Sequence, residues 1–281
     1  MNLKILSENN FPTAAGLASS AAGFAALVRA IANLYQLPAS PTELSRIARQ
    51  GSGSACRSLF GGYVGWNAGT EADGSDSVAY EVAPANHWPD MRALILVASA
   101  EKKDISSTTG MQATVATSAL FEHRANVVVP KRMKAMEKAI QDRDFEAFAA
   151  LTTKDSNNFH ACCHDTDPPI FYMNDTSRAA VRMCEAINAA AGRTVCAYTF
   201  DAGPNAVIYY LVENEAVVAG TFKKFLGEKT GWEGQRGQAV QGAQQLPDGV
   251  EGLVGMLQKG VSRVILTGVG EGPKKTEEYL C

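Results

Sequence analysis

The sequence predicts a mixed α/β protein, with helices and strands in an α+β arrangement. Segments with strand-like spacing alternate with segments of helical spacing along the 281 residues. Hydrophobic residues make up 46% of the chain, which is enough to build the core of one or two domains. The order of the elements gives the fold class, whereas the pattern does not decide how the strands are connected.

The first part of the chain predicts two helices and three strands. Residues 3–6 have strand-like spacing, and a helix follows the small-residue stretch 12–23, because apolar residues continue there at helical spacing. Ser40-Pro41-Thr42-Glu43 forms a capping box with proline in the first turn, which predicts a helix running toward residue 50. Residues 51–58 form a second small-residue loop, and 62–66 and 78–82 predict strands around a turn.

The second part begins after the proline-bounded segment 84–89, which we expect to be a domain boundary. A nearly continuous apolar run at 92–99 predicts a strand buried in a sheet. Strands at 195–200 and 206–211 enclose a turn, and 261–267 predicts a closing strand. Residues 227–260 are expected to be a variable loop with some helix. Helices are expected at about 108–125, 130–141, 144–158, 170–191 and 213–226.

Composition excludes several classes of function. The net charge is −3 and the positive residues are scattered, so no nucleic-acid partner is expected. No apolar run approaches membrane-spanning length, and the N-terminus lacks the pattern of a secretory signal. The six cysteines show no disulfide-framework spacing, which favours a reducing, cytoplasmic location.

The small-residue stretch 12–23 predicts a site that holds phosphate. Glycine and alanine let backbone N–H groups approach an anion closely, and a helix start adds unpaired donors and a positive dipole end. Ser19 and Ser20 add hydroxyl groups at that start. No Gly-Lys-Ser/Thr follows, so this is not the common P-loop. The alternative is a turn that serves only close helix packing.

Three segments resemble the mevalonate diphosphate decarboxylase family. Residues 8–21 (ENNFPTAAGLASSA) are similar to its ATP-phosphate loop, and 51–58 (GSGSACRS) and 198–206 (YTFDAGPNA) to its signature segments. The resemblance reaches about residue 212, returns at 263–273, and is weak at 227–260. The family belongs to a superfamily of small-molecule kinases that includes galactokinase, homoserine kinase and mevalonate kinase.

The resemblance implies a two-lobed kinase fold with the active site between the lobes. Residues 1–86 would be the remainder of the N-terminal, ATP-binding lobe, and 90–281 the C-terminal lobe. The family's lysine-containing substrate motif, which precedes the phosphate loop, has no counterpart in this sequence. We therefore expect the N-terminal lobe to be incomplete.

The resemblance also implies the reaction. ATP would phosphorylate the tertiary hydroxyl of mevalonate 5-diphosphate, and loss of that phosphate and of the carboxylate would give isopentenyl diphosphate, ADP, phosphate and CO2. ATP and Mg²⁺ are the implied cofactors, with magnesium carried by ATP and no separate metal site. A homodimer acting in isoprenoid and sterol synthesis is expected.

Three residues are the expected catalytic group. Asp201 would face the tertiary hydroxyl and accept or orient its proton, although an Asp in such a turn also commonly bonds its own loop. Arg57 would grip a carboxylate or phosphate with paired bonds, the alternative being a surface arginine. Ser20 would contact the ATP phosphates or their magnesium.

The remaining candidates are binding residues, carried over from the resemblance. The predicted ATP-binding residues are Gly16, Leu17, Ala18, Ser19 and Ser20, and the predicted substrate-binding residues are Ser52, Gly53, Ser54, Ala55, Cys56, Arg57 and Thr108. Helix capping is the alternative role for the serines of the second loop and for Thr108, because hydroxyl residues are frequent at helix starts.

Two alternatives to the decarboxylase function stay open. One is a sister kinase that stops at the phosphorylated product, and the other is a non-catalytic remnant lacking substrate contacts. His160 and His164 share a helix face at a spacing that can bind zinc, with Cys162 and Cys163 between them. The two cysteines point about 100° apart and cannot both join the histidines, so we expect no metal site there.

Overall fold

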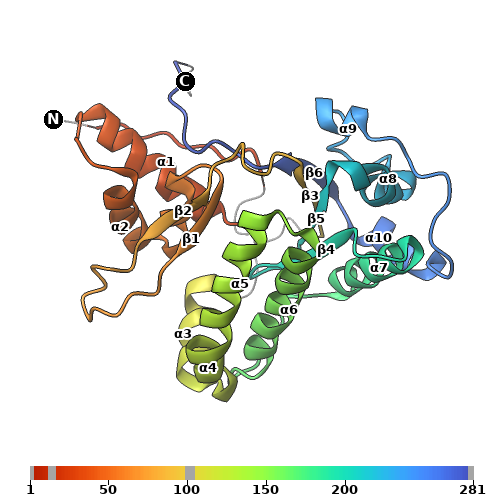
Figure 1. Ribbon diagram of the computed structural model, residues 1–281, viewed down its shortest axis with the longest axis horizontal. Coiled ribbons are helices and arrows are strands. Elements are labelled where there is room, and N and C mark those ends of the chain that lie inside the picture. The colour runs from red at the N-terminus through yellow and green to blue at the C-terminus, as the bar shows by residue number, and fades with distance from the viewer. Residues whose placement is uncertain (1–2, 12–16, 99–104, 278–281) are drawn as a thin grey trace. The chain divides into compact units, whose positions relative to one another are not determined.

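The computed structural model describes residues 3–11, 17–98 and 105–277 and has the mixed helix-and-sheet fold that the sequence predicts (Figure 1). By their internal contacts the residues divide into two compact units. Unit 1 comprises Met1–Pro89 and Val269–Cys281, and unit 2 comprises Asp90–Gly268. The residues that follow unit 2 therefore group with unit 1.

Unit 1 is built on two helices and a short 3₁₀ helix: α1 (Ser19–Leu34), α2 (Pro41–Gly51) and η1 (Gly53–Leu59). The predicted capping box is present, because the Glu43 N–H donates to Ser40 Oγ and the Ser40 N–H donates to Glu43. Small side chains dominate the core between these helices, so the helices approach closely. The core residues are Ala21, Ala25, Ala32, Leu44, Ala48, Ala55 and Leu59.

Strands β1 (Tyr63–Trp66) and β2 (Ala79–Ala83) form an antiparallel pair in unit 1. The strand predicted at 3–6 is wrong. Leu3, Ile5 and Leu6 are 47%, 54% and 54% exposed, and within the described chain no segment pairs with them. Strand-like spacing does not form a strand unless a neighbouring backbone takes up its N–H and C=O groups.

The segment after unit 2 packs on the loop before β1. The Gly62 N–H donates to the Gly270 carbonyl at 2.8 Å. A Cβ on Gly61 would lie 2.4 Å from the Glu271 backbone, so this close approach requires glycine.

Unit 2 contains a four-stranded sheet in the order β4-β5-β3-β6, with every neighbouring pair antiparallel (Figure 1). The strands are β3 (Met91–Val97), β4 (Cys196–Phe200), β5 (Ala206–Leu211) and β6 (Arg263–Gly268). Strand β4 is therefore at one edge, and its far end leads into the turn that carries Asp201.

Helices cover both faces of this sheet. The main core lies between the sheet and α7 (Asp175–Ala191), α8 (Glu215–Leu226) and α10 (Glu251–Gly260), and it includes Tyr210. The ring of Phe148, on α6 (Phe145–His164), meets Tyr209 edge-on at 5.5 Å. Because successive strand residues point to opposite faces, α6 lies on the face away from the main core.

Most of the predicted helices of unit 2 are present, with shifted boundaries. The segment 107–142 contains α3 (Ser107–Thr117), α4 (Ala119–His123), the π-helix η2 (Arg124–Val128) and α5 (Val129–Asp142). Helix α7 begins at Asp175 rather than near 170, because the Asn174 side chain caps it by accepting from the Ser177 N–H. The variable segment holds α9 (Gln235–Ala239) and α10, and the 3₁₀ turn η3 (Val212–Asn214) precedes α8.

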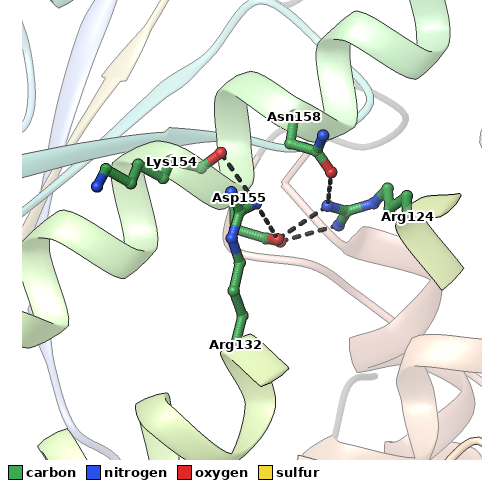
Figure 2. A network of polar contacts seen from close by, with 5 residues as sticks. All are labelled: Arg124, Arg132, Lys154, Asp155 and Asn158. Carbon is green, nitrogen blue, oxygen red and sulfur yellow. Dashed lines mark hydrogen bonds and ion pairs between the residues drawn. The ribbon is translucent and has the colours of Figure 1, made fainter. Parts of the chain in front are cut away.

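An ion-pair network ties η2 and α5 to α6 (Figure 2). Arg124 donates to both carboxylate oxygens of Asp155, at 2.8 and 2.9 Å, and to the Asn158 side chain at 2.6 Å. Arg132 reaches the same carboxylate at 3.0 Å. Burial raises the pKa of Asp155, but the two guanidinium groups outweigh burial and hold the pKa below its ordinary value. The paired charges fix α6 against its neighbouring helices.

In the described part of the chain, no helix is both long and apolar enough to cross a membrane.

Candidate active site

Asp201 occupies an exposed position directly after a buried strand end. Phe200, the last residue of β4, is only 4% exposed, whereas Asp201 belongs to the exposed class. The Gly203 N–H donates to the Asp201 carbonyl at 2.7 Å, which tightens the turn. Ala202 is buried against Cys163, Ile170 and Tyr172. Asp201 is therefore exposed at the surface, while the buried side chain of Ala202 anchors the turn.

Hydrogen bonds to other elements hold Pro204 and Asn205, the last residues of this turn. Ser177, at the start of α7, donates to the Pro204 carbonyl at 2.7 Å. Asn205 is fully buried, and its Oδ1 accepts from the Ala98 N–H at the end of β3 at 2.7 Å. The alternative role for Asp201 was a carboxylate that bonds its own loop, and among the hydrogen bonds of the described residues no bond from this carboxylate to the loop is present.

The strand end before Asp201 is held by α6. The Phe200 N–H donates to Ser156 Oγ at 3.1 Å, and His160 Nε2 lies 3.4 Å from the Phe200 carbonyl. His160 is 4% exposed, and burial lowers the pKa of its imidazole to about 4, so the ring is neutral near pH 7. A neutral ring that contacts a carbonyl through Nε2 must carry its proton there.

Thr108 lies in the first turn of α3 and is exposed. The cap of this helix is Ser106, whose Oγ accepts from the Thr109 N–H at 3.0 Å, so Thr108 itself does not cap the helix. The Tyr172 hydroxyl donates to the Ser106 carbonyl at 3.4 Å, and burial raises the pKa of Tyr172 to about 12. Tyr172 thus connects the start of α3 with the cluster that anchors Ala202.

In unit 1 the two small-residue loops meet through Ser20 and Ser52, whose hydroxyl oxygens lie 3.0 Å apart. Ser19 and Ser20 are the first two residues of α1, and among the described residues no side-chain cap is present, because Ala18 at the N-cap position has no polar side chain. Ala18, just before it, has a left-handed backbone with φ 60°. The arrangement leaves the N-terminal end of α1, with its positive dipole end, beside two hydroxyl groups. Leu17 precedes Ala18, and Gly16 lies outside the described residues.

Arg57 is half-buried, and its guanidinium lies 5.7 Å from the centre of the Trp66 ring. This contact with an aromatic face restricts the side chain and leaves its N–H edge available to bind an anion. Gly53 packs against the same ring, since a Cβ there would lie 3.1 Å from it.

The other residues of the second loop differ in their burial. Ser54 is half-buried, whereas Ala55 and Cys56 are fully buried. Burial raises the pKa of the Cys56 thiol, which keeps it neutral. Ala55 and Cys56 can therefore reach a ligand only through their backbone groups.

The histidines of the zinc alternative contact other groups. His160 faces Phe200, and the His164 ring lies 5.1 Å from the Phe171 ring. Among the residues that the structure describes, no cluster of three or more His, Cys, Asp or Glu side chains is arranged to hold a metal ion. From the sequence, His160 was interpreted only as a possible zinc ligand, and no role was predicted for Ser156. The available signal was their four-residue spacing, which places both on one helix face.

Two family models match this chain. Residues 1–79 match a diphosphomevalonate decarboxylase-like N-terminal domain, and residues 93–276 match the mevalonate 5-diphosphate decarboxylase C-terminal domain. The diphosphomevalonate decarboxylase mvd1 of Aspergillus fumigatus is 66% identical over 283 residues, which span 99% of this chain and 70% of that protein.

Solved structures agree with the family models. The crystal structure of a mevalonate 5-diphosphate decarboxylase superposes with a TM-score of 0.87 at 56% identity, over 97% of this chain and 71% of the other. Another, described as MDDEF in complex with MVAPP, AMPPCP and magnesium, has a TM-score of 0.70 at 31% identity, over 93% of this chain and 68% of that one.

The mixed fold and these neighbours define a protein of the small-molecule kinase superfamily. Within that superfamily the chain belongs to the diphosphomevalonate decarboxylase family, whose members are ATP-dependent decarboxylases. The family resemblance of the three sequence segments is thereby confirmed.

Proposed function

We propose that this chain converts mevalonate 5-diphosphate and ATP to isopentenyl diphosphate, ADP, phosphate and CO2, with Asp201 as its catalytic carboxylate. The observation that carries the assignment is the Asp201 turn, in which an exposed carboxylate follows a buried strand end. A carboxylate held at a fixed position can orient the substrate hydroxyl or accept its proton during phosphoryl transfer.

Asp201 would act on the tertiary hydroxyl of the substrate. Phosphorylation makes that oxygen a good leaving group, and the electrons for the new double bond come from the substrate's own carboxylate as CO2 departs. The protein must therefore hold the hydroxyl in line with the γ-phosphate of ATP and stabilise the charge that is transferred. We assign the first requirement to Asp201, and the phosphate-binding groups proposed below would meet the second.

Ser20 and the start of α1 are the proposed ATP-phosphate site, together with Gly16, Leu17, Ala18 and Ser19. Helix N–H groups and hydroxyls suit phosphate oxygens. The hydroxyl of Ser20 is also a hard oxygen donor of the kind that Mg²⁺ accepts, so the residues fit a magnesium ion carried by ATP. Bound magnesium would neutralise part of the phosphate charge.

Arg57 and the loop around it are the proposed site for the diphosphate and carboxylate of the substrate. Ser52, Gly53 and Ser54 would contribute hydroxyl and backbone donors, Ala55 and Cys56 backbone groups alone, and Thr108 an exposed hydroxyl. Support comes from the MDDEF structure, which is described as a complex with MVAPP, an ATP analogue and magnesium. Lobes at 1–86 and 90–281, a homodimer, a cytoplasmic location and a role in sterol synthesis stay predictions.

The test is the stoichiometry of the reaction, measured on the purified chain after circular dichroism has shown that it is folded. ADP and CO2 released in equal amounts from mevalonate 5-diphosphate, ATP and magnesium is the expected result. ADP without CO2 would support the sister kinase instead. A folded chain that releases neither product would contradict the proposed function and favour the non-catalytic alternative.

A further inference from the structure

We propose that Ser156 and His160 of α6 are positioning residues that set the direction of the Asp201 carboxylate by holding Phe200, the residue before it. This inference rests on the proposed function, because it assumes that Asp201 acts on the substrate. It assigns a role to two residues that contact no proposed ligand group and that act through the backbone.

The first argument is the spacing of the two side chains. Residues four apart lie on one face of a helix and about 6 Å apart along its axis. The N–H and C=O of one strand residue point to the same side of the strand. Ser156 Oγ accepts from the Phe200 N–H at 3.1 Å, and His160 Nε2 faces the Phe200 C=O at 3.4 Å. Both torsions of Phe200 are therefore restrained from a single helix face.

The second argument is the place of Phe200 in the sheet. Strand β4 is an edge strand whose one side pairs with β5, where Phe200 is opposite Ala206. Its other side has no strand partner in the described sheet, and at Phe200 side chains of α6 contact the backbone groups in place of a strand. The backbone N–H and C=O of Phe200 are thus held by side chains of α6, directly before Asp201.

The third argument is the state of the imidazole. His160 is 4% exposed, and its Nδ1 is buried without a hydrogen-bond partner in the described part of the chain. The groups around the ring are His164 on the same helix, the Phe159 and Phe200 rings, and Asp201. Burial lowers the pKa of His160 to about 4. A neutral ring restrains the backbone without neutralising Asp201, whose carboxylate stays available for the substrate.

A small displacement of Asp201 would have a large effect on the rate. An error of about 1 Å in the placement of a catalytic group can cost on the order of a hundredfold in rate. Ligand affinity would change little, because neither Ser156 nor His160 belongs to the proposed anion sites. The expected signature is therefore a lower kcat at an unchanged KM.

The experiment compares Ser156→Ala, His160→Leu and His160→Gln in the full chain. Glutamine keeps an N–H at about the position of Nε2, whereas leucine removes it. We expect His160→Leu and Ser156→Ala to lower kcat about ten- to a hundredfold while KM for both substrates stays within about twofold. His160→Gln should recover kcat to within about threefold of the wild type.

Asn188→Ala is the matched control. The Asn188 side chain bonds β4 at its opposite end, accepting from the N–H groups of Val195 and Cys196 at 2.8 and 3.0 Å. The Asn188→Ala substitution removes hydrogen bonds between a helix side chain and the backbone at the start of β4, which is the end of the strand far from Asp201. We expect Asn188→Ala to lower the melting temperature and to leave kcat within about twofold.

A second measurement tests the structure of the Asp201 turn independently of enzyme activity. The Gly203 N–H bonds the Asp201 carbonyl at 2.7 Å, so its hydrogen exchange reports whether the turn is intact. Exchange about tenfold faster in Ser156→Ala and His160→Leu than in Asn188→Ala is expected.

The outcomes separate the inference from the proposed function. If Asp201→Asn is inactive but Ser156→Ala has wild-type kcat and Gly203 exchange, the positioning role is overturned and the function stands. Equal kcat losses in Asn188→Ala and Ser156→Ala would also overturn it, because the effect would then be general to β4. Turnover at the wild-type rate in Asp201→Asn contradicts the catalytic assignment itself, and faster Gly203 exchange would still show that α6 holds the turn.

Discussion

The two groups of candidate residues are held in place in opposite ways. In unit 2, the backbone around Asp201 is bonded by side chains from α6 and α7 and by the buried Asn205. In unit 1, the described parts of the two loops that carry the candidate anion-binding groups share the buried core residues Ala21 and Ala55, and a polar contact between them is the hydroxyl pair Ser20 and Ser52. The polar groups of the first region are bonded from several elements, whereas the hydroxyl groups of the second are joined by an exposed contact above a core of small apolar side chains.

This difference agrees with the roles that we propose for the two regions. A group that orients one hydroxyl must be preorganised, because each ångström of misplacement costs rate. A cradle for polyanions gains its contacts from the ligand, whose many oxygens bond backbone N–H and hydroxyl groups as they bind. We therefore expect substitutions near Asp201 to change kcat, and those around Ser20 and Ser52 to change affinity.

The largest expected effect is that of Asp201→Asn. The substitution keeps the shape of the side chain but removes its charge, so kcat should fall by about 10³-fold or more. ATP affinity, measured by calorimetry with a non-hydrolysable analogue, should stay within about twofold. Asp175→Asn, at an exposed carboxylate that pairs with Arg178, is the control and should leave kcat unchanged. Wild-type turnover in Asp201→Asn would remove Asp201 from the mechanism.

Arg57→Lys should have the next largest effect. Lysine cannot make a paired grip on a carboxylate or phosphate, and it loses the flat contact with the Trp66 ring. We expect kcat/KM for mevalonate 5-diphosphate to fall about ten- to a hundredfold, mainly through KM. Arg46→Lys, at an exposed position on α2, serves as the control. An unchanged KM in Arg57→Lys would show that Arg57 is only a surface residue.

Ser20 and Ser52 should be energetically coupled. Because their hydroxyls lie 3.0 Å apart, each single alanine variant removes the same contact. The double variant should therefore lose less affinity for ATP than the sum of the single losses, by about 0.5–1 kcal/mol. A double-mutant cycle from titrations of all four proteins measures this coupling, and strict additivity would show that the two loops bind independently.

Asp155→Asn should affect stability rather than turnover. It breaks the charge pairing of the half-buried network in Figure 2 and leaves Arg124, whose side chain is 14% exposed, without its carboxylate. We expect the free energy of unfolding to fall by about 1–2 kcal/mol with kcat nearly unchanged. Disrupting the exposed pair Lys138–Asp142 by Asp142→Asn should change the free energy of unfolding much less than Asp155→Asn does, because solvent screens that pair. Equal losses from the two variants in urea titrations would contradict this ranking.

The same network should give a pH dependence of known sign. The pKa of Asp155 is lower in the folded chain than its ordinary value, so the folded state favours the charged form. Its stabilisation is complete above the unfolded pKa near 4 and is lost as the pH falls through the folded pKa. Urea titrations between about pH 6 and 3 should therefore show a shallower loss of stability in Asp155→Asn than in the wild type.

Elements whose stabilising contacts lie between residues close in the sequence could be predicted, whereas elements that depend on distant residues could not. The capping box at Ser40 and the strand–turn–strand unit around Asp201 are encoded by adjacent residues, and both are present. Residues 3–6 failed because a strand needs a partner, which periodicity cannot supply. Helix α6 extends to His164, beyond the predicted 158, because its last turns contact β4 and the cluster around Tyr172.

The candidate site and its surroundings could be predicted only in part, for the same reason, and the roles of its residues stay predictions. Asp201, Arg57 and Ser20 lie in short segments that resemble the family, whereas the support of Asp201 comes from residues more than forty positions upstream, such as Ser156. A pattern of single residues cannot show that a serine and a histidine on one helix bond the end of a distant strand. The burial of Ala55 and Cys56 likewise depends on packing between α1, α2 and η1.

The division of unit 1 into two stretches of chain has a consequence for biosynthesis. Residues from Val269 onward are translated after the whole of Asp90–Gly268, yet the Gly270 carbonyl is the partner of the Gly62 N–H. On the ribosome, unit 2 has all its strands before unit 1 receives its final contact. Unit 1 therefore completes its contacts last. In a nascent chain halted near Gly268, the Gly62 N–H would lack the Gly270 carbonyl that accepts its hydrogen bond.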